Sequence, residues 1–119
     1  MDKQNNIANK SKAFAIRIIR MYQFLTTEKK DFILSKQLLR CGTSIGANVR
    51  ESIYGQSRPD FHTKLTIALK EAAETEYWLE LLVETGYITQ EQYTSIANDC
   101  VEIPKILTAI TKQTKTTNY

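Results

Sequence analysis

Residues 61–83 read FHTKLTIALKEAAETEYWLELLV, and this stretch decides the fold class. Its apolar and small residues recur at steps of three and four, the spacing of one face of an α-helix. They are Phe61, Leu65, Ala68, Leu69, Ala72, Thr75, Leu79, Leu82 and Val83. Pro59 suits the first helical turn, and Ser57 and Asp60 can accept its free amide protons. We therefore expect a helix over 59–85.

The same periodicity predicts three more helices, over about 9–25, 32–54 and 90–110. Four amphipathic helices with short connections are typical of an all-α, up-down-up-down four-helix bundle. The length of 119 residues fits one domain covering 1–119.

Local signals mark the ends of these helices. Thr89 and Gln92 have the spacing of a capping box, and Gly55 is expected in the left-handed conformation after the second helix. Pro104 predicts a kink or break near 101–103, because its ring would clash with a carbonyl of the preceding turn. The polar residues 111–119 are expected to fray.

Composition excludes several classes of protein. Four glycines and two prolines are too few for a turn-rich sandwich or barrel, and no apolar stretch approaches the roughly 20 residues that span a bilayer. The first residues lack the pattern of a signal peptide, and two cysteines make no disulfide framework. A cytoplasmic protein without membrane contact is expected.

The net charge of +3 hides a division along the chain. Residues 1–70 hold 13 basic and 5 acidic side chains, whereas residues 71–119 hold 3 basic and 8 acidic. Such asymmetry indicates an anionic partner or self-association of unlike faces. The alternative is that the solvated faces of separate helices differ in sign.

The second predicted helix has a second row of small and apolar residues beside its main stripe. Gly42, Gly46, Val49 and Ile53 follow one another at steps of four, three and four. Glycine inside a helix costs about 1 kcal/mol relative to alanine, so close approach of another backbone is expected there. We predict an oligomer interface at this row and at Trp78; the alternative is tight packing against the third helix of the same subunit.

Polar residues and cysteines offer little chemistry. Ser44, Asn48 and Glu51 share one side of the second helix and are predicted to form a structural hydrogen-bond network. Glu51 could also pair with Lys64 or Arg50, and the sequence does not decide between them. His62 is the only histidine, so no metal site, cofactor site or catalytic set is expected. Cys41 and Cys100 fall on apolar stripes and are expected in the core.

Two long motifs resemble a known family. Residues 39–52 read LRCGTSIGANVRES, and residues 64–82 contain KLTIALKEA and ETEYWLELL. Over about residues 8–110 the chain resembles the bacterial four helix bundle protein family, also called the 23S rRNA intervening-sequence protein family. Pro59 and Pro104 depart from the usual pattern of that family.

The resemblance implies a left-handed bundle that assembles as a ring, typically a homopentamer. A related protein is the accessory protein of diversity-generating retroelements, a basic pentamer that binds nucleic acid and reverse transcriptase. No enzymatic activity is established for the family, and we expect none here.

The basic residues of the first two helices are the best functional candidates. They are Lys10, Arg17, Arg20, Lys36, Arg40 and Arg50. Cyclic symmetry would multiply such a cluster into a site for phosphates, so we predict binding of structured nucleic acid, RNA rather than DNA. The competing hypothesis is a protein-interaction scaffold that presents the acidic and aromatic face of the third helix.

Overall fold

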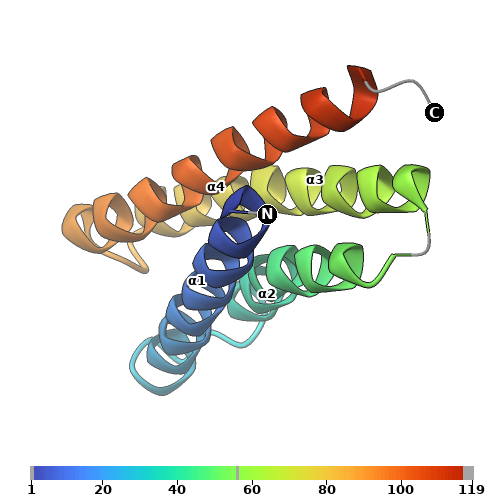
Figure 1. The fold of residues 1–119 in the computed structure, drawn as a ribbon. Coiled ribbons are helices and arrows are strands. Elements are labelled where there is room, and N and C mark those ends of the chain that lie inside the picture. The colour runs from blue at the N-terminus through green and yellow to red at the C-terminus, as the bar shows by residue number, and fades with distance from the viewer. Residues whose placement is uncertain (1, 56, 117–119) are drawn as a thin grey trace.

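The computed structural model describes residues 2–55 and 57–116, and the side chains of residues 6–55 and 57–113. This part of the chain forms four helices and no strand: α1 (Asp2–Thr27), α2 (Leu34–Ile53), α3 (Arg58–Glu84) and α4 (Gln90–Thr116). Each helix contacts two neighbours, in the cyclic order α1–α2–α3–α4 (Figure 1). Short turns reverse the chain between them, which confirms the predicted four-helix bundle.

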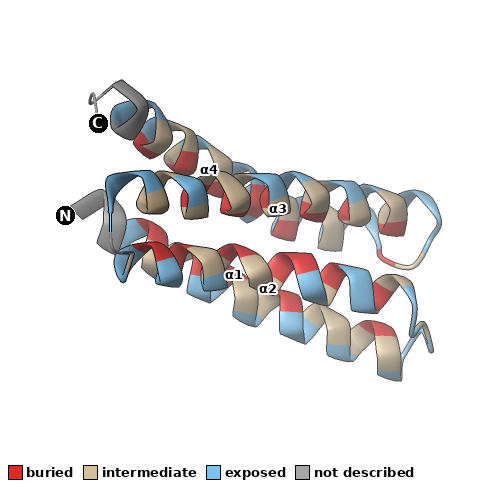
Figure 2. Ribbon diagram, turned by 90° about the vertical axis from the view of Figure 1, so that its right-hand side faces the viewer, coloured by how far each residue is buried: buried red, intermediate tan, exposed pale blue. Residues whose placement is uncertain are grey.

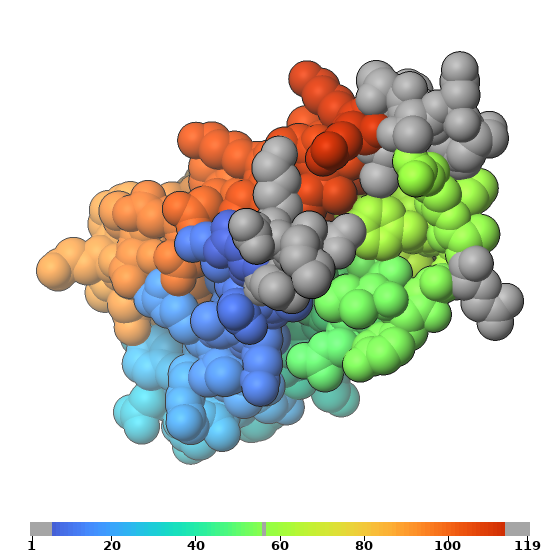
Figure 3. Space-filling view, in the orientation of Figure 1, coloured from blue at the N-terminus to red at the C-terminus, as the bar shows by residue number. Residues whose placement is uncertain are grey.

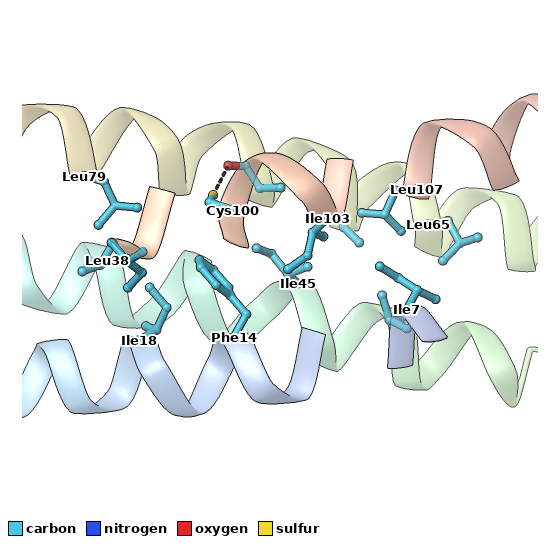
Figure 4. Close-up of a cluster of buried hydrophobic side chains, with 14 of the residues drawn as sticks. Ile7, Phe14, Ile18, Leu38, Ile45, Leu65, Leu79, Cys100, Ile103 and Leu107 are labelled. Carbon is cyan, nitrogen blue, oxygen red and sulfur yellow. Dashed lines mark hydrogen bonds between the residues drawn. The ribbon is translucent and has the colours of Figure 1, made fainter. Parts of the chain in front are cut away.

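The core lies where the apolar stripes of the four helices meet. Figure 2 shows the buried positions turned towards the inside of the bundle and the exposed positions turned outward. Figure 4 shows side chains from all four helices in one cluster, among them Phe14, Ile45, Leu79 and Leu107. All four are at most 1% exposed, so the predicted stripes are confirmed at these positions.

The predicted caps of α3 and α4 are present. Ser57 Oγ accepts a hydrogen bond from the amide of Asp60 at 3.2 Å. The Thr89 amide donates to Gln92 Oε1 at 2.8 Å, and the Gln92 amide donates to Thr89 Oγ1 at 3.1 Å. Both arrangements satisfy amides that have no partner within the helix.

Two helix starts differ from the prediction. α1 begins at Asp2 instead of residue 9, because Ile7 is 2% exposed and extends the buried stripe towards the N-terminus. α2 begins at Leu34 instead of residue 32. The Asp31 carboxylate accepts from the amide of Ser35 at 2.7 Å and thereby caps the helix two residues later than expected.

The left-handed conformation predicted for Gly55 is wrong. Among the described residues, positive φ angles occur at Gly86 (85°) and Lys30 (56°). A Cβ at position 55 would lie 2.6 Å from Asp60 Oδ2, the end of a side chain that can turn aside, and 3.2 Å from the Ser52 carbonyl oxygen, so space there is tight without requiring glycine.

α4 is continuous through Pro104, so of the predicted kink or break the break is wrong, and the kink stays a prediction. Ile103 and Leu107, on either side of the proline, are both buried, and their packing holds the helix across the lost hydrogen bond. Towards its C-terminus α4 diverges from α3 (Figures 1 and 2). The fraying expected from residue 111 is also wrong as far as Thr116, and residues 117–119 lie outside the described part of the chain. No described helix is long and apolar enough to cross a bilayer.

Candidate nucleic-acid interface

Two of the six predicted basic residues join α1 to α4. The Arg17 guanidinium donates to Asp99 Oδ2 at 2.6 Å, to the Ser95 carbonyl at 3.0 Å and to Ser95 Oγ at 2.8 Å. Lys10 forms an ion pair with Glu102 on the same seam. Figure 3 shows the face on which α1 lies beside α4. Both cations are therefore engaged within the bundle.

A third basic residue, Arg40, joins α2 to α3. It forms an ion pair with Glu74, and its Nη1 lies 3.5 Å from Glu71 Oε1. The Trp78 indole donates to Glu74 Oε2 at 2.9 Å. This hydrogen bond, reinforced by the one from Arg40, lowers the pKa of Glu74, and the bond to Glu74 raises the pKa of Arg40.

The same contacts revise the interface predicted at Trp78. Its ring is half-buried, and its only polar atom is bonded within the chain. The neighbouring Tyr77 is 53% exposed and meets Trp78 edge-on, with 5.5 Å between the ring centroids. The exposed aromatic side chain of this face is therefore Tyr77.

These ion pairs account for part of the charge division along the chain. Lys10, Arg17 and Arg40 come from the basic half, and all of their acidic partners come from the acidic half. Opposite charges of the two halves thus meet between helices of one molecule. Lys10, Arg17 and Arg40 thus tie helices together, and the phosphate contacts predicted for them stay a prediction.

The other three predicted basic residues lie on the solvent side of α1 and α2. Arg20 donates to Gln23 Oε1 at 3.4 Å, a neighbour on its own helix. Lys36 and Arg50 are exposed and have no ion-pair partner among the described side chains. They are fourteen residues apart, close to four helical turns, so they share one face of α2.

A shallow groove between α1 and α2 adds a fourth basic residue to this face. The groove measures about 220 Å³ and is lined by Ala8, Lys12, Ala15, Thr43, Gly46, Ala47 and Arg50. Lys12 was not predicted, and the sequence offered no signal for it, because periodicity does not show which helix faces the glycine row of α2. We call Lys12, Arg20, Lys36 and Arg50, all exposed, the outer basic face.

The glycine row of α2 packs inside the subunit. A Cβ on Gly42 would lie 2.7–3.0 Å from side-chain atoms of Ile18, and one on Gly46 would lie 3.3 Å from the Ser11 carbonyl oxygen. Val49 is 1% exposed, and only Ile53 faces solvent, at 46%. The close approach was predicted correctly, but the neighbour is α1 of the same chain, neither a partner chain nor α3. Gly42 and Val49 are therefore buried within the subunit, which contradicts the interface predicted for them, whereas the interface predicted at Gly46 and Ile53 stays a prediction.

The polar residues of α2 form two separate groups. Asn48 Nδ2 donates to the Ser44 carbonyl at 2.9 Å and to Ser44 Oγ at 3.0 Å. Glu51 instead pairs with Lys64 of α3 at 2.9 Å. The network predicted for the three residues is thus confined to Ser44 and Asn48, and of the two partners considered for Glu51 the structure shows Lys64.

The cysteines are buried and unpaired. The Cys100 thiol donates to the Ala72 carbonyl at 3.7 Å (Figure 4), and burial raises its pKa to about 12. Burial also raises the pKa of Cys41. In the described part of the chain, no group of three or more His, Cys, Asp or Glu side chains could hold a metal ion.

The comparisons with known proteins agree with this fold. A crystal structure of a protein of unknown function from the S23 ribosomal protein family of Bacteroides thetaiotaomicron is 61% identical to this chain. It matches with a TM-score of 0.91 over 92% of this chain and 98% of the other. No curated protein matches. The family described as 23S rRNA-intervening sequence protein matches residues 3–109, and the chain belongs to this family.

Proposed function

We propose that the chain is a non-enzymatic, homo-oligomeric bundle that binds structured nucleic acid through the outer basic face. The observation that carries this proposal is the division of the cations into two groups. Three cations form ion pairs between helices: Lys10, Arg17 and Arg40. Four others are exposed to solvent: Lys12, Arg20, Lys36 and Arg50. Exposed cations on a rigid helical hairpin are suited to phosphate contacts.

RNA is favoured over DNA as the ligand. The family description links its members to an intervening sequence of 23S rRNA. Lysine and arginine contacts to phosphates give salt-dependent binding with little base specificity, and structured RNA is recognised largely by its shape and backbone.

The test is retention on immobilised structured RNA at about 50 mM salt, where phosphate contacts are strongest. The double variant Lys36→Glu/Arg50→Glu is expected to lose retention. The matched control is Lys105→Glu/Lys112→Glu, which makes the same charge change at two exposed positions of α4. The proposal fails if the unmodified protein is not retained. Equal loss in both variants would show that net charge alone matters.

Self-assembly into a ring, with a pentamer as the expected size, is the second part of the proposal. One molecule carries the outer basic face and an acidic face on α3 that includes Glu76, Glu80 and Glu84. Unlike faces on one chain favour head-to-tail contacts, which close into rings when the rotation permits. Light scattering on the unmodified protein tests it, and a monomeric mass would contradict it.

A protein-interaction scaffold is the alternative. The exposed Tyr77 between Glu76 and Glu80 favours it, because exposed tyrosines are common interface anchors. Co-purification of a defined protein that survives nuclease treatment and is lost in Tyr77→Ala would favour the scaffold over RNA binding.

A further inference from the structure

The turn between α1 and α2 exposes two large apolar side chains. Phe32 is 59% exposed and Ile33 is 76% exposed, the latter among the most exposed apolar residues described. Each leaves apolar surface in contact with water, and burial of that surface would be favourable. A turn at the surface is ordinarily made of polar residues and glycine, so the fold alone gives no reason for this pair.

Other residues hold the turn in place. The amide of Asp31 donates to the Leu25 carbonyl at 3.0 Å. Ser35, which is fully buried, donates its amide to Asp31 Oδ2 and its hydroxyl to the Asp31 carbonyl, both at 2.7 Å. The turn is therefore fixed by Asp31 and Ser35.

Phe32 and Ile33 make no comparable contribution to the turn. Ile33 occupies the N-cap position of α2 and makes no capping hydrogen bond with its side chain. Neither residue belongs to the buried core or to the apolar side chains packed against it. A rigid turn thus presents two apolar side chains that the subunit does not use.

Lysines flank this pair in the sequence. Lys29, Lys30 and Lys36 are all exposed within four residues of Phe32, and Glu28 is the one exposed carboxylate of the same turn, since the half-buried Asp31 is engaged with Ser35. Lys29 Nζ lies 5.9 Å from the centroid of the Phe24 ring. We call Lys29, Lys30, Phe32, Ile33 and Lys36 the turn tip.

The turn tip is continuous with the outer basic face through Lys36, which belongs to both. From Lys36 the face follows α2 to Arg50 near the other end of the helix. The 20 residues of α2 correspond to about 30 Å of helix. A double-stranded stem lying along this face would bring its terminal loop to the turn tip.

We propose that the turn tip binds the unpaired loop of an RNA stem–loop, with Phe32 stacking on a base and the lysines contacting the flanking phosphates. This inference rests on the proposed function and adds the form of RNA that the face accepts. A flat aromatic ring among cations matches a base with its phosphates. Two side chains are too small for a protein interface, which takes about 800 Å² from each partner.

The experiment compares two RNAs with the same stem, one closed by a single-stranded loop and one a blunt duplex. Affinities are measured by fluorescence anisotropy at about 50 mM salt, where phosphate contacts are strong. Phe32→Ala is expected to lower the affinity for the stem–loop about tenfold, in the range that loss of one stacking platform produces. The duplex should bind the variant as it binds the unmodified protein.

Two control variants accompany Phe32→Ala. Phe32→Trp keeps an aromatic face and should retain the affinity for the stem–loop. Tyr77→Ala removes an exposed aromatic ring from another helix, α3, and should leave both affinities unchanged. Because Phe32 is mostly exposed, Phe32→Ala should melt at the same temperature as the unmodified protein.

The outcomes separate this inference from the proposed function. If the unmodified protein binds neither RNA, both fail. If it binds both RNAs and Phe32→Ala leaves the affinities unchanged, or lowers them equally, only the role of the turn tip is overturned. Binding to phosphatidylserine vesicles that Phe32→Ala abolishes, with RNA affinity intact, would identify a lipid surface as the occupant and also overturn the inference.

Discussion

α1 meets its two neighbours by different physical means. Towards α2 the contact is one of shape, with Ile18 against Gly42 and the Ser11 backbone against Gly46. Towards α4, the ion pairs of Lys10 with Glu102 and of Arg17 with Asp99 supplement the apolar contacts of the core. Among the described side chains no ion pair joins α1 to α2. Close packing therefore joins the α1–α2 hairpin, and charge helps to join that hairpin to the α3–α4 hairpin.

Cations that serve the fold are thus distinct from cations that are free for a ligand. A cation in a seam pairs with a carboxylate of the same molecule, whereas a cation on the outer basic face is surrounded by water and salt ions. Similar basic residues in the sequence thus have different expected roles, and mutations can distinguish them.

The largest expected effect breaks the α1–α2 contact. Gly42→Ala places a methyl group within 3.0 Å of the buried Ile18 and should lower the free energy of unfolding by about 1–3 kcal/mol. Gly46→Ala meets only a 3.3 Å contact and gains about 1 kcal/mol of helix propensity, so its net effect should be small. Urea denaturation measures both, and equal losses would contradict the packing described.

A smaller effect is expected at the α1–α4 seam. Arg17 and Asp99 have side chains that are 40% and 50% exposed, so solvent screens their attraction. A double-mutant cycle with Arg17→Gln and Asp99→Asn should give a coupling of about 0.5–1 kcal/mol. The coupling should vanish near 1 M salt, where the screening length is about 3 Å. A coupling that survives high salt would show that the seam does not depend on charge.

The α2–α3 seam should respond to acid. The pKa of Glu74 is lowered in the folded protein, so ionised Glu74 stabilises the fold above its unfolded pKa, and this contribution is lost as the pH falls through the folded value. Glu74→Gln should therefore lose less stability than the unmodified protein between about pH 5 and 3, around the ordinary glutamate value. Melting temperatures across this range measure the difference, and parallel curves would contradict it.

The smallest change is expected in the reactivity of Cys100. Because its pKa is raised to about 12, the buried thiol should resist iodoacetamide at about pH 8, whereas an unfolded cysteine with a pKa near 8.5 reacts. The unfolded thiol ionises first as the pH rises, so this group should lower stability above about pH 8.5. Rapid labelling of the folded protein would show that the core opens.

The sequence could predict what depends on near neighbours. The caps at Ser57 and Thr89 involve residues three positions apart, and the apolar stripes reflect helical geometry, so both were predictable. The unbroken helix at Pro104 was not, because packing on both sides of the proline outweighs its local preference.

The partners of the charged and small residues could not be predicted from the sequence, for a related reason. Arg17 and Asp99 are 82 positions apart, and nothing local distinguishes a cation that reaches another helix from one that reaches solvent. The glycine row indicated close approach, but periodicity cannot tell which helix approaches. Ile33 at the N-cap of α2 was equally unpredictable, since Asp31 performs the capping from outside the expected position.

The central claim is that seam cations serve the fold and outer cations bind RNA, and the salt dependence of RNA affinity tests it most directly. Each phosphate contact removed should reduce the slope of log affinity against log salt by about 1. Lys36→Ala and Arg50→Ala should each show this reduction, while Lys10→Ala and Arg17→Ala should keep the unmodified slope. The reverse pattern, with slopes that fall only in the Lys10 and Arg17 variants, would contradict the account.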